Sequence, residues 1–456
     1  MLKTAYFKTV FRNLSLIKFS QGFLALFILF FPFQIRTLVY SGSYYLTGNF
    51  NEFTSFFVYI NDLFLVLALF FWGLAYFHQN VIKKNQEDSA KISLQFGDHY
   101  LTFLLLLFLG ALSIETIWIE NRMLHFMLLF RLLEFVAFYF LIVQKLIPWK
   151  KMIVIFLISV GFQAFLAILQ YFVQGSLGLR VFGEPIANSS TLGVAKIDVG
   201  GGKVLRAFGT FPHANVLGGT LMMALIFVWL FKKWPLVLKS LFLSLFMIAL
   251  LLCFSRSALF GLFAAFMIYF AVSNKKFPYK LIFLIISLVA FFVVLFNLES
   301  VFFQRFLLGD LNSDQERTLY LGIGKLMLFD NPFGVGLGGF TVNMQNYSLS
   351  KIAPWIYQPV HNVYLLVANE GGLITFALFM AVLGYVFYRL VAVIKDCNEQ
   401  QKMQAYIYIA LLSSIATVSL FDHYFFSLYP GLFLLFFYLG LTSEFLSSFR
   451  LPSKKS

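Results

Sequence analysis

The chain has 456 residues, of which 60% are hydrophobic, 20% aromatic and only 12% charged, with a formal net charge of +14. This composition excludes an ordinary soluble globular protein and indicates a polytopic membrane protein. The basic residues fall between apolar segments, where they are topology signals, so they give little support to a nucleic-acid partner. With one cysteine in an apolar run (Cys253) and the other in a basic loop (Cys397), a disulfide framework is excluded.

Twelve apolar segments are predicted to be transmembrane helices, because about 20 mostly apolar residues cross a ~30 Å hydrocarbon core. They lie near residues 19–39, 54–77, 99–114, 123–143, 152–173, 213–231, 240–255, 257–273, 280–297, 371–389, 405–421 and 430–447. The predicted fold is therefore all-α, a polytopic protein that forms a single membrane domain over residues 1–456.

The distribution of positive charge predicts which side of the membrane each loop faces. With the N-terminus inside, 22 of the 34 Lys and Arg residues fall in inside segments, each of which is positive. Both termini are therefore predicted to be cytoplasmic. Two long loops, residues 174–212 and 298–370, then lie outside the cell membrane and are expected to contain short helices. Loops on a rigid scaffold commonly carry function, so the second loop is the predicted catalytic one.

Two arginines at the ends of predicted spans are candidates for a functional role: Arg206, which precedes a span, and Arg256, which lies between two spans. In LRAFGTFPHANVLGG, Arg206 precedes a glycine-containing turn, and His213 stands where the next span begins. Arg256 lies in CFSRSAL, in a tight connection between two short spans. A guanidinium at the membrane edge is costly unless it pairs or reaches lipid phosphates, so Arg256 is either a functional residue or a snorkelling one. His213 is equally compatible with a structural helix start.

The segment DQERTLYLGIGKLMLFDNPFGVGLGGF places Arg317 before a dense glycine turn. The glycines at 334, 336 and 339 have the spacing of a dinucleotide fingerprint, but no strand precedes them, so the match is false. The letters DLNSDQ imitate the start of a calcium loop, although glutamine stands where that loop requires glycine. The six histidines have no metal-ligand spacing, and we predict no metal and no cofactor.

His361 opens the segment HNVYLLVANEGG at the boundary between a polar loop and an apolar run. A neutral imidazole beside arginines suits a general base, while the alternative is a helix-start residue with its ring at the lipid interface. If a helix starts here, Glu370 lies on the opposite face, so we do not expect it to orient His361.

These four segments, in this order, resemble the O-antigen ligase and polymerase superfamily of bacterial multi-span glycosyltransferases over residues 200–390. The resemblance implies inverting, metal-independent transfer of a glycan from an undecaprenyl-pyrophosphate donor to an acceptor hydroxyl, at the outer face of the bacterial plasma membrane. It implies catalytic roles for Arg256, Arg317 and His361. Substrate contacts are expected from a second set: Arg206, His213, Asn362 and Gly336. Guanidinium groups suit a pyrophosphate leaving group because they hold phosphate oxygens as charge develops.

Other assignments stay open. The acceptor is a second lipid-linked repeat for a polymerase, and another glycan, a lipid or a protein for a ligase, and the sequence does not decide. From a different class, a twelve-span secondary transporter or lipid-linked glycan flippase would use charged residues near the midplane, namely Asp62, Arg131 and Glu134. We interpret the Arg131 and Glu134 pair as structural, and the long second loop favours an enzyme.

Overall fold

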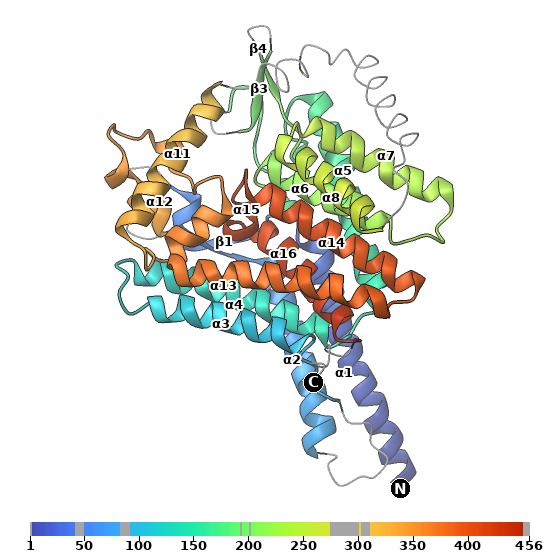
Figure 1. Ribbon diagram of the computed structural model, residues 1–456. Coiled ribbons are helices and arrows are strands. Elements are labelled where there is room, and N and C mark those ends of the chain that lie inside the picture. Colours follow the sequence, from blue (N-terminus) through green and yellow to red (C-terminus); the bar gives the residue numbers. More distant parts are fainter. Residues whose placement is uncertain are drawn as a thin grey trace.

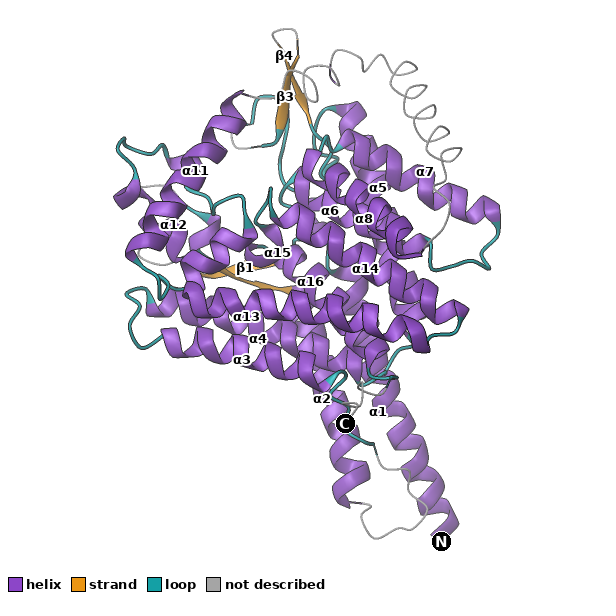
Figure 2. Cartoon of the chain, in the orientation of Figure 1, coloured by secondary structure: helices purple, strands orange, loops and turns teal. Residues whose placement is uncertain are grey.

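The computed structural model describes residues 2–41, 50–82, 92–191, 194–199, 202–273, 301 and 311–449, and these residues are mostly helical (Figures 1 and 2). The α-helices are α1 (Leu2–Phe30), α2 (Ile60–Phe77), α3 (His99–Glu115), α4 (Arg122–Val143), α5 (Trp149–Val173), α6 (Ala214–Val228), α7 (Leu236–Leu252), α8 (Arg256–Ser273), α11 (Leu311–Asp330), α12 (Gly339–Asn343), α13 (Val363–Val393), α14 (Glu399–Ser419), α15 (Tyr424–Ser427) and α16 (Tyr429–Leu446). Short 3-10 turns and one π turn join some of them.

Within the described residues, six helices are long and apolar enough to cross a membrane, by length and composition. They cover Ile60–Asn80, Arg122–Val143, Trp149–Val173, Arg256–Ser273, Val363–Asp396 and Tyr429–Leu446. Four shorter apolar helices, Ser15–Phe30, His99–Glu115, Ala214–Val228 and Leu236–Leu252, coincide with other predicted spans. The predicted span 280–297 lies outside the described residues. A membrane protein of helices is thereby confirmed, while the number twelve and the sidedness of the loops stay predictions.

The first two predicted spans include residues that form strands, at the C-terminal end of the first span and near the N-terminal end of the second. Strand β1 (Arg36–Tyr40) takes in residues 36–39 of the first predicted span, and strand β2 (Phe56–Tyr59) lies inside the second. The two strands pair antiparallel. Their residues are β-branched and aromatic, which favours strands, and an apolar run this short does not distinguish a strand from the end of a helix.

The helical core is organised around α16, which is almost completely buried. Phenylalanine rings from the surrounding helices pack on it: Phe433 stacks on Phe31 with centroids 4.1 Å apart and on Phe138 at 5.1 Å. One turn later, Phe437 contacts Phe156 of α5 at 5.4 Å. Much of the phenylalanine in this sequence therefore packs between helices, where such ring pairs add to the effect of simple burial.

A buried ion cluster joins α2 and α4. Arg131 forms an ion pair with Asp62 at 2.7 Å and a second one with Glu134, one turn later on its own helix. Its guanidinium also donates to the carbonyl of Phe57 in β2. The predicted pairing of Arg131 with Glu134 is confirmed, and Asp62 completes it. Buried carboxylates that share one guanidinium satisfy the rule that buried charges are paired.

The glycine turn after α11 packs against a break in α13. Gly372, inside α13, has φ 69° and ψ 176°, so the helix is interrupted there. The N–H groups of Val335 and Gly336 donate to the carbonyls of residues 369 and 370 at 2.9 Å, and Leu373 N–H donates to Pro332. Such a backbone approach requires glycine, because a Cβ on Gly334 would stand 2.7 Å from the Gly372 nitrogen. The turn thus serves packing.

The two segments predicted as long loops contain the expected short helices, namely 3-10 turns and α12, together with a β hairpin and the 20-residue α11, which were not predicted. Residues 174–212 hold a 3-10 turn (Arg180–Phe182) and an antiparallel hairpin of β3 (Lys196–Val199) and β4 (Gly202–Leu205). The described part of 298–370 contains α11, α12 and two 3-10 turns, Met344–Tyr347 and Pro354–Ile356. In Figure 1 the hairpin stands at the top of the molecule and α11 lies beside α12.

Candidate functional site

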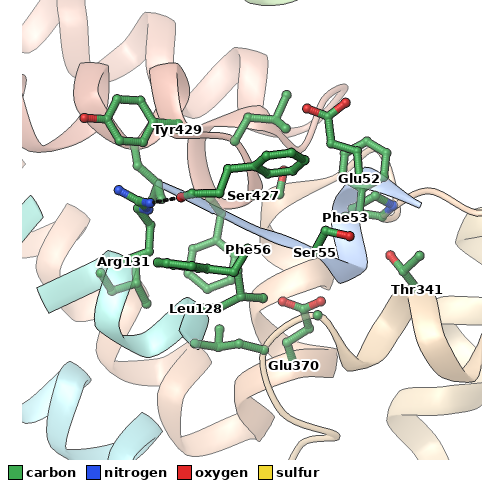
Figure 3. Close-up of a pocket in the computed structure, with 18 of the residues that line it drawn as sticks. Glu52, Phe53, Ser55, Phe56, Leu128, Arg131, Thr341, Glu370, Ser427 and Tyr429 are labelled. Carbon is green, nitrogen blue, oxygen red and sulfur yellow. Dashed lines mark hydrogen bonds between the residues drawn. The ribbon is translucent and has the colours of Figure 1, made fainter. Parts of the chain in front are cut away.

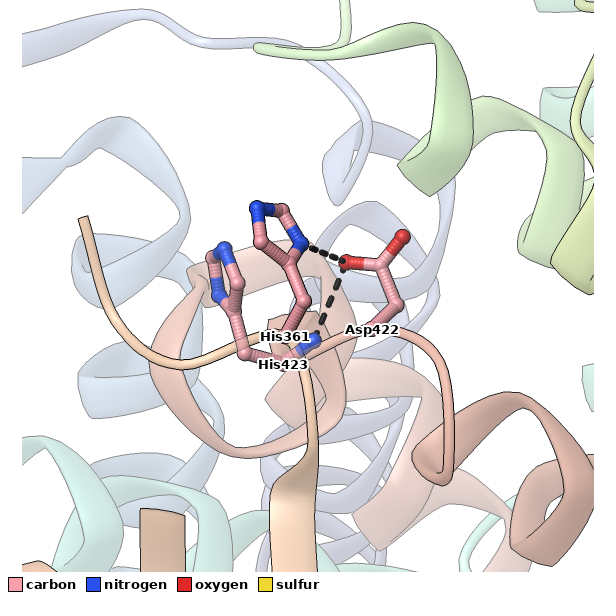
Figure 4. A group of neighbouring side chains, drawn as sticks. All are labelled: His361, Asp422 and His423. Carbon is pink, nitrogen blue, oxygen red and sulfur yellow. Dashed lines mark hydrogen bonds and ion pairs between the residues drawn. The ribbon is translucent and has the colours of Figure 1, made fainter. Parts of the chain in front are cut away.

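Three titratable side chains meet where α13 begins and α14 ends. His361 precedes α13, and Asp422 and His423 form the turn between α14 and α15. The Nδ1 atom of His361 lies 3.7 Å from Oδ1 of Asp422, and the rings of His361 and His423 are 4.9 Å apart. In Figure 4 the His361 ring lies between the other two side chains. We call His361, Asp422 and His423 the histidine cluster.

The turn that carries Asp422 is fastened to the start of α13. Asn362 is the N-cap of α13: its side chain accepts from Leu365 N–H at 2.9 Å, and its amide donates to the carbonyl of Leu420 at 3.2 Å. An N-cap side chain satisfies an otherwise unpaired helix N–H group. Asn362 therefore fixes His361 relative to the Asp422 turn, and this contact to the protein occupies the side chain that was predicted to bind substrate.

Asp422 is buried, 4% exposed, and both of its oxygens are engaged. Oδ2 accepts a hydrogen bond from Asn215 Nδ2 at 2.7 Å, and Oδ1 accepts one from the backbone N–H of His423 at 3.0 Å. Burial alone would raise the pKa of this carboxyl group, but contact with His361 and the nearby His423 and His213 lowers the pKa well below its usual range. Asp422 is consequently a carboxylate at neutral pH.

Arg206 supports Asp422 through Asn215. Arg206 is buried, and its Nη2 donates to Asn215 Oδ1 at 2.5 Å while its Nε donates to the carbonyl of Cys253 at 2.7 Å. A continuous polar chain therefore runs from Arg206 through Asn215 and Asp422 to His361. His213 is the N-cap of α6 and accepts from Asn215 N–H at 3.1 Å, so it joins the same neighbourhood as a structural cap.

His423 forms the other side of the cluster. Its Nδ1 lies 2.5 Å from Ser427 Oγ, and its ring packs edge-on against Phe53 at 5.5 Å. Burial lowers the pKa of His423 to about 3, and repulsion from His361 and His213 acts in the same direction. His423 is therefore neutral over the physiological range. The imidazole that can exchange a proton with a ligand is His361, whose side chain is 18% exposed.

The two predicted catalytic arginines belong to helices that reach this cluster. Arg256 is the first residue of α8, and one turn later Phe260 packs on Phe421, the neighbour of Asp422, with centroids 5.9 Å apart. Arg317 lies on α11, and one turn later Tyr320 contacts the His361 ring at 5.6 Å. Residues three or four apart share a helix face, so both arginines lie on faces adjoining the cluster.

Gly336 is placed differently from the other predicted residues. Its N–H group donates to the carbonyl of Glu370, and a Cβ at this position would stand 3.2 Å from His125 Nδ1. Gly336 is therefore part of the packed glycine turn. Glu370 lies nine residues after His361 and contacts this turn instead, through the N–H groups of Gly338 and Phe340, as its predicted separation from His361 requires.

The histidine cluster also has the donor atoms of a metal site. One ligand atom from each of its three residues lies within 4.8 Å of the others. Two imidazoles and a carboxylate match the donors that Zn²⁺ and related ions take in proteins. Spacing along the chain did not reveal this group, because His361 and His423 are brought together only by the tertiary fold.

The fold and the site together define a helical membrane protein with a partly accessible histidine beside a buried carboxylate. Residues 240–380 match the model of a known family, described as O-antigen ligase, and this match supports the resemblance to the O-antigen ligase and polymerase superfamily. The matched segment includes Arg256, Arg317 and His361 but ends before Asp422. No curated protein matches the chain. The general activity of this superfamily is glycosyl transfer.

Proposed function

We propose that this protein is an inverting glycosyltransferase that moves a glycan from an undecaprenyl-pyrophosphate donor to an acceptor hydroxyl at the outer face of the plasma membrane. The observation that carries the proposal is the placement of His361, whose Nδ1 faces the buried Asp422 carboxylate at 3.7 Å while the ring keeps partial exposure. A carboxylate at Nδ1 favours the tautomer with its proton on that nitrogen. The lone pair of Nε2 is then available to accept the proton of an acceptor hydroxyl.

The arginines supply the other half of the mechanism. As the glycosyl bond breaks, negative charge gathers on the pyrophosphate, and Arg256 and Arg317 hold its oxygens through bidentate hydrogen bonds. The acceptor oxygen attacks the anomeric carbon from the opposite face while His361 takes its proton, so the configuration inverts. The bond from the acceptor oxygen to the anomeric carbon forms as the bond from that carbon to the pyrophosphate breaks. The leaving group departs as undecaprenyl pyrophosphate and the proton passes to His361, so no further reactant is needed.

The decisive experiment replaces His361 and Arg317 by alanine in the native host. We expect each variant to lose surface glycan and to accumulate the lipid-linked donor. His99→Ala and Arg180→Ala, at exposed positions, are the matched controls and should keep wild-type glycan. Arg256→Lys and Arg317→Lys should also lose most activity, because an ammonium group cannot form the paired hydrogen bonds of a guanidinium. Normal glycan transfer in both alanine variants would overturn the proposal.

Two related assignments are separated by further measurements. A gene deletion that leaves single repeats on the carrier or the acceptor indicates a polymerase, whereas intact long chains stranded on the carrier indicate a ligase. The donor set of the histidine cluster makes a metal-assisted reaction the second candidate mechanism. In that case a chelator would abolish transfer by purified protein and Zn²⁺ or Mn²⁺ would restore it, whereas the base mechanism predicts no effect of chelator.

A further inference from the structure

A cavity lies beside the histidine cluster and is lined by β1, β2, α4, α13 and the segment from α15 into α16 (Figure 3). It leaves about 90 Å³ for the centres of water-sized molecules, which is several times what one buried water needs. Aromatic rings form a large part of its wall: Phe53, Phe56, Phe57, Tyr59, Phe426 and Tyr429. Such rings present apolar faces on which a flat ligand can pack.

The charged groups of the cavity compensate one another. Arg36 is paired with Glu52 at 2.5 Å and packs over the Phe57 ring at 4.1 Å. Arg131 already engages two carboxylates, of Asp62 and Glu134. Its guanidinium lies over aromatic rings on either side, at 4.8 Å from Phe56 and 4.9 Å from Tyr429. Because both arginines are neutralised by carboxylates, the cavity does not suit a pyrophosphate, which requires uncompensated positive charge.

Further hydrogen-bonding groups face the remaining space. The carboxyl group of Glu370 and the hydroxyl of Thr341 point toward Ser55 across the opening in Figure 3. Thr341 is 0% exposed, and its Oγ1 has no hydrogen-bond partner among the described residues. A buried hydroxyl without a partner is costly, and a ligand hydroxyl would satisfy it. Hydroxyl-rich ligands with apolar ring faces are neutral sugars.

The position of the cavity relative to His361 tells which substrate it fits. On one side of His361 stands Asp422, which is connected through Asn215 to Arg206 and, through the carbonyl of Cys253, to the turn before Arg256. On the other side stands His423, and its two further neighbours, Ser427 and Phe53, both line the cavity. The cavity and the region of Arg206 and Arg256 thus lie on different sides of the proposed base, while Arg317 belongs to the helix whose Tyr320 contacts the His361 ring.

From this arrangement we infer that the cavity is the acceptor subsite and that it holds a neutral sugar ring of the acceptor, next to the ring whose hydroxyl His361 deprotonates. This inference rests on the proposed function and specifies its acceptor as a carbohydrate. Among the acceptors that the family allows, it selects a glycan, free or as part of a glycolipid, over a protein. The aromatic wall binds the sugar face, and Glu370 and Thr341 bind its hydroxyls.

The test uses two cavity variants, each with a matched control. Leu128→Phe fills the cavity from α4, and Leu133→Phe makes the same change at an exposed position of that helix. Thr341→Val removes the unpartnered hydroxyl without changing shape. Its control is Thr417→Val, whose hydroxyl donates to the carbonyl of residue 413 in its own helix. Native-like expression and elution of the detergent-solubilised full chain are verified first.

The assay measures two reactions of purified protein with lipid-linked glycan extracted from a deletion strain of the host. One is transfer to surface glycan or glycolipid of the same strain, and the other is slow release of glycan to water without acceptor. We expect Leu128→Phe to raise the acceptor KM at least tenfold and Thr341→Val to raise it about fivefold, the usual effect of one hydrogen bond. Donor KM, release to water and both controls should stay at wild-type values.

The outcomes separate the two proposals. If both cavity variants transfer with an unchanged acceptor KM, or if they lose transfer and release to water in equal measure, the acceptor subsite is refuted while the glycosyltransferase assignment stands. Should saturating amounts of a protein acceptor replace the glycan with equal efficiency in the wild type, the sugar assignment is likewise refuted. If the wild type itself catalyses neither reaction, the proposed function fails first, and the subsite fails with it.

Discussion

Replacing Asp422 by asparagine is the most direct test of how the histidine cluster works. The substitution keeps the size of the side chain and removes the negative charge that faces His361. The single side-chain oxygen of asparagine can still accept one of the two hydrogen bonds that Asn215 and the His423 backbone N–H donate to Asp422, but its amide nitrogen cannot accept the other. The effect on the chemical step can be estimated from the separation of the charges. When His361 has taken the acceptor proton, an imidazolium and a carboxylate stand 3.7 Å apart.

At an effective dielectric constant of about 20, two such charges attract each other by about 4 kcal/mol. The side chains are 18% and 5% exposed, so solvent screens this attraction only in part. Losing it entirely would slow the step by about three orders of magnitude, and an asparagine oxygen recovers some of it. We therefore expect kcat to fall about 100-fold to 1000-fold, with little change in donor KM.

The assay is the transfer reaction with purified Asp422→Asn protein, at saturating donor and acceptor. Asp396→Asn, at an exposed position after α13, is the matched control and should transfer at the wild-type rate. The melting temperature in detergent distinguishes lost chemistry from lost folding. A kcat within threefold of wild type would refute the orienting role of Asp422, as would a loss of rate that follows only a loss of folded protein.

Further predictions concern the surrounding structure. Burial lowers the pKa of His423 from its ordinary value of 6.5 to about 3. Below pH 6.5 the unfolded chain therefore binds a proton on His423 that the folded chain does not bind. The wild type should therefore lose about 2 kcal/mol of stability between pH 6.5 and 5, as measured by melting curves over this pH range. The variant His423→Asn retains a polar contact to Ser427 and should lose far less stability over the same range. Arg131→Met leaves two buried carboxylates without their partner, so the free energy of unfolding in detergent should fall by about 3–5 kcal/mol, and a loss below 1 kcal/mol would contradict the buried ion cluster. Gly372→Ala forces a Cβ to within 2.5 Å of the Phe333 backbone at a φ of 69° and should reduce folded yield, whereas Gly384→Ala, which meets nothing within 4 Å, should not, as measured by fluorescence-detected size exclusion.

The helical membrane fold could be predicted from the sequence because hydropathy reports burial in lipid directly. The segments 123–143 and 152–173 match α4 and α5 within a few residues. The strands at 36–40 and 56–59 were missed, because both continue the apolar runs of neighbouring helices. Length and composition detect a span but do not determine where inside an apolar run the backbone changes conformation.

The candidate site was predicted only in part, for a reason that lies in the chain topology. His361 was identified by its position at the end of a polar loop, but its carboxylate neighbour was not, since Asp422 lies 61 residues later, beyond two helices. One local signal was present. The letters FDHYFF place a carboxylate and an imidazole directly after the predicted span 405–421, where polar groups at a membrane boundary often have a function.

The helices that surround the cluster explain why such a site can exist in so apolar a chain. Three long helices begin beside it: α6 next to Asn215, α8 at Arg256, and α13 after Asn362. Each start carries N–H groups without an intrahelical partner and a partial positive charge, which together favour an anion nearby. The negative charge of Asp422 lies in the partial positive charge of these helix starts, which offsets part of the cost of burying it. The helix starts and the two guanidinium groups together also favour a ligand whose negative charge increases during the reaction, as that of a departing pyrophosphate does.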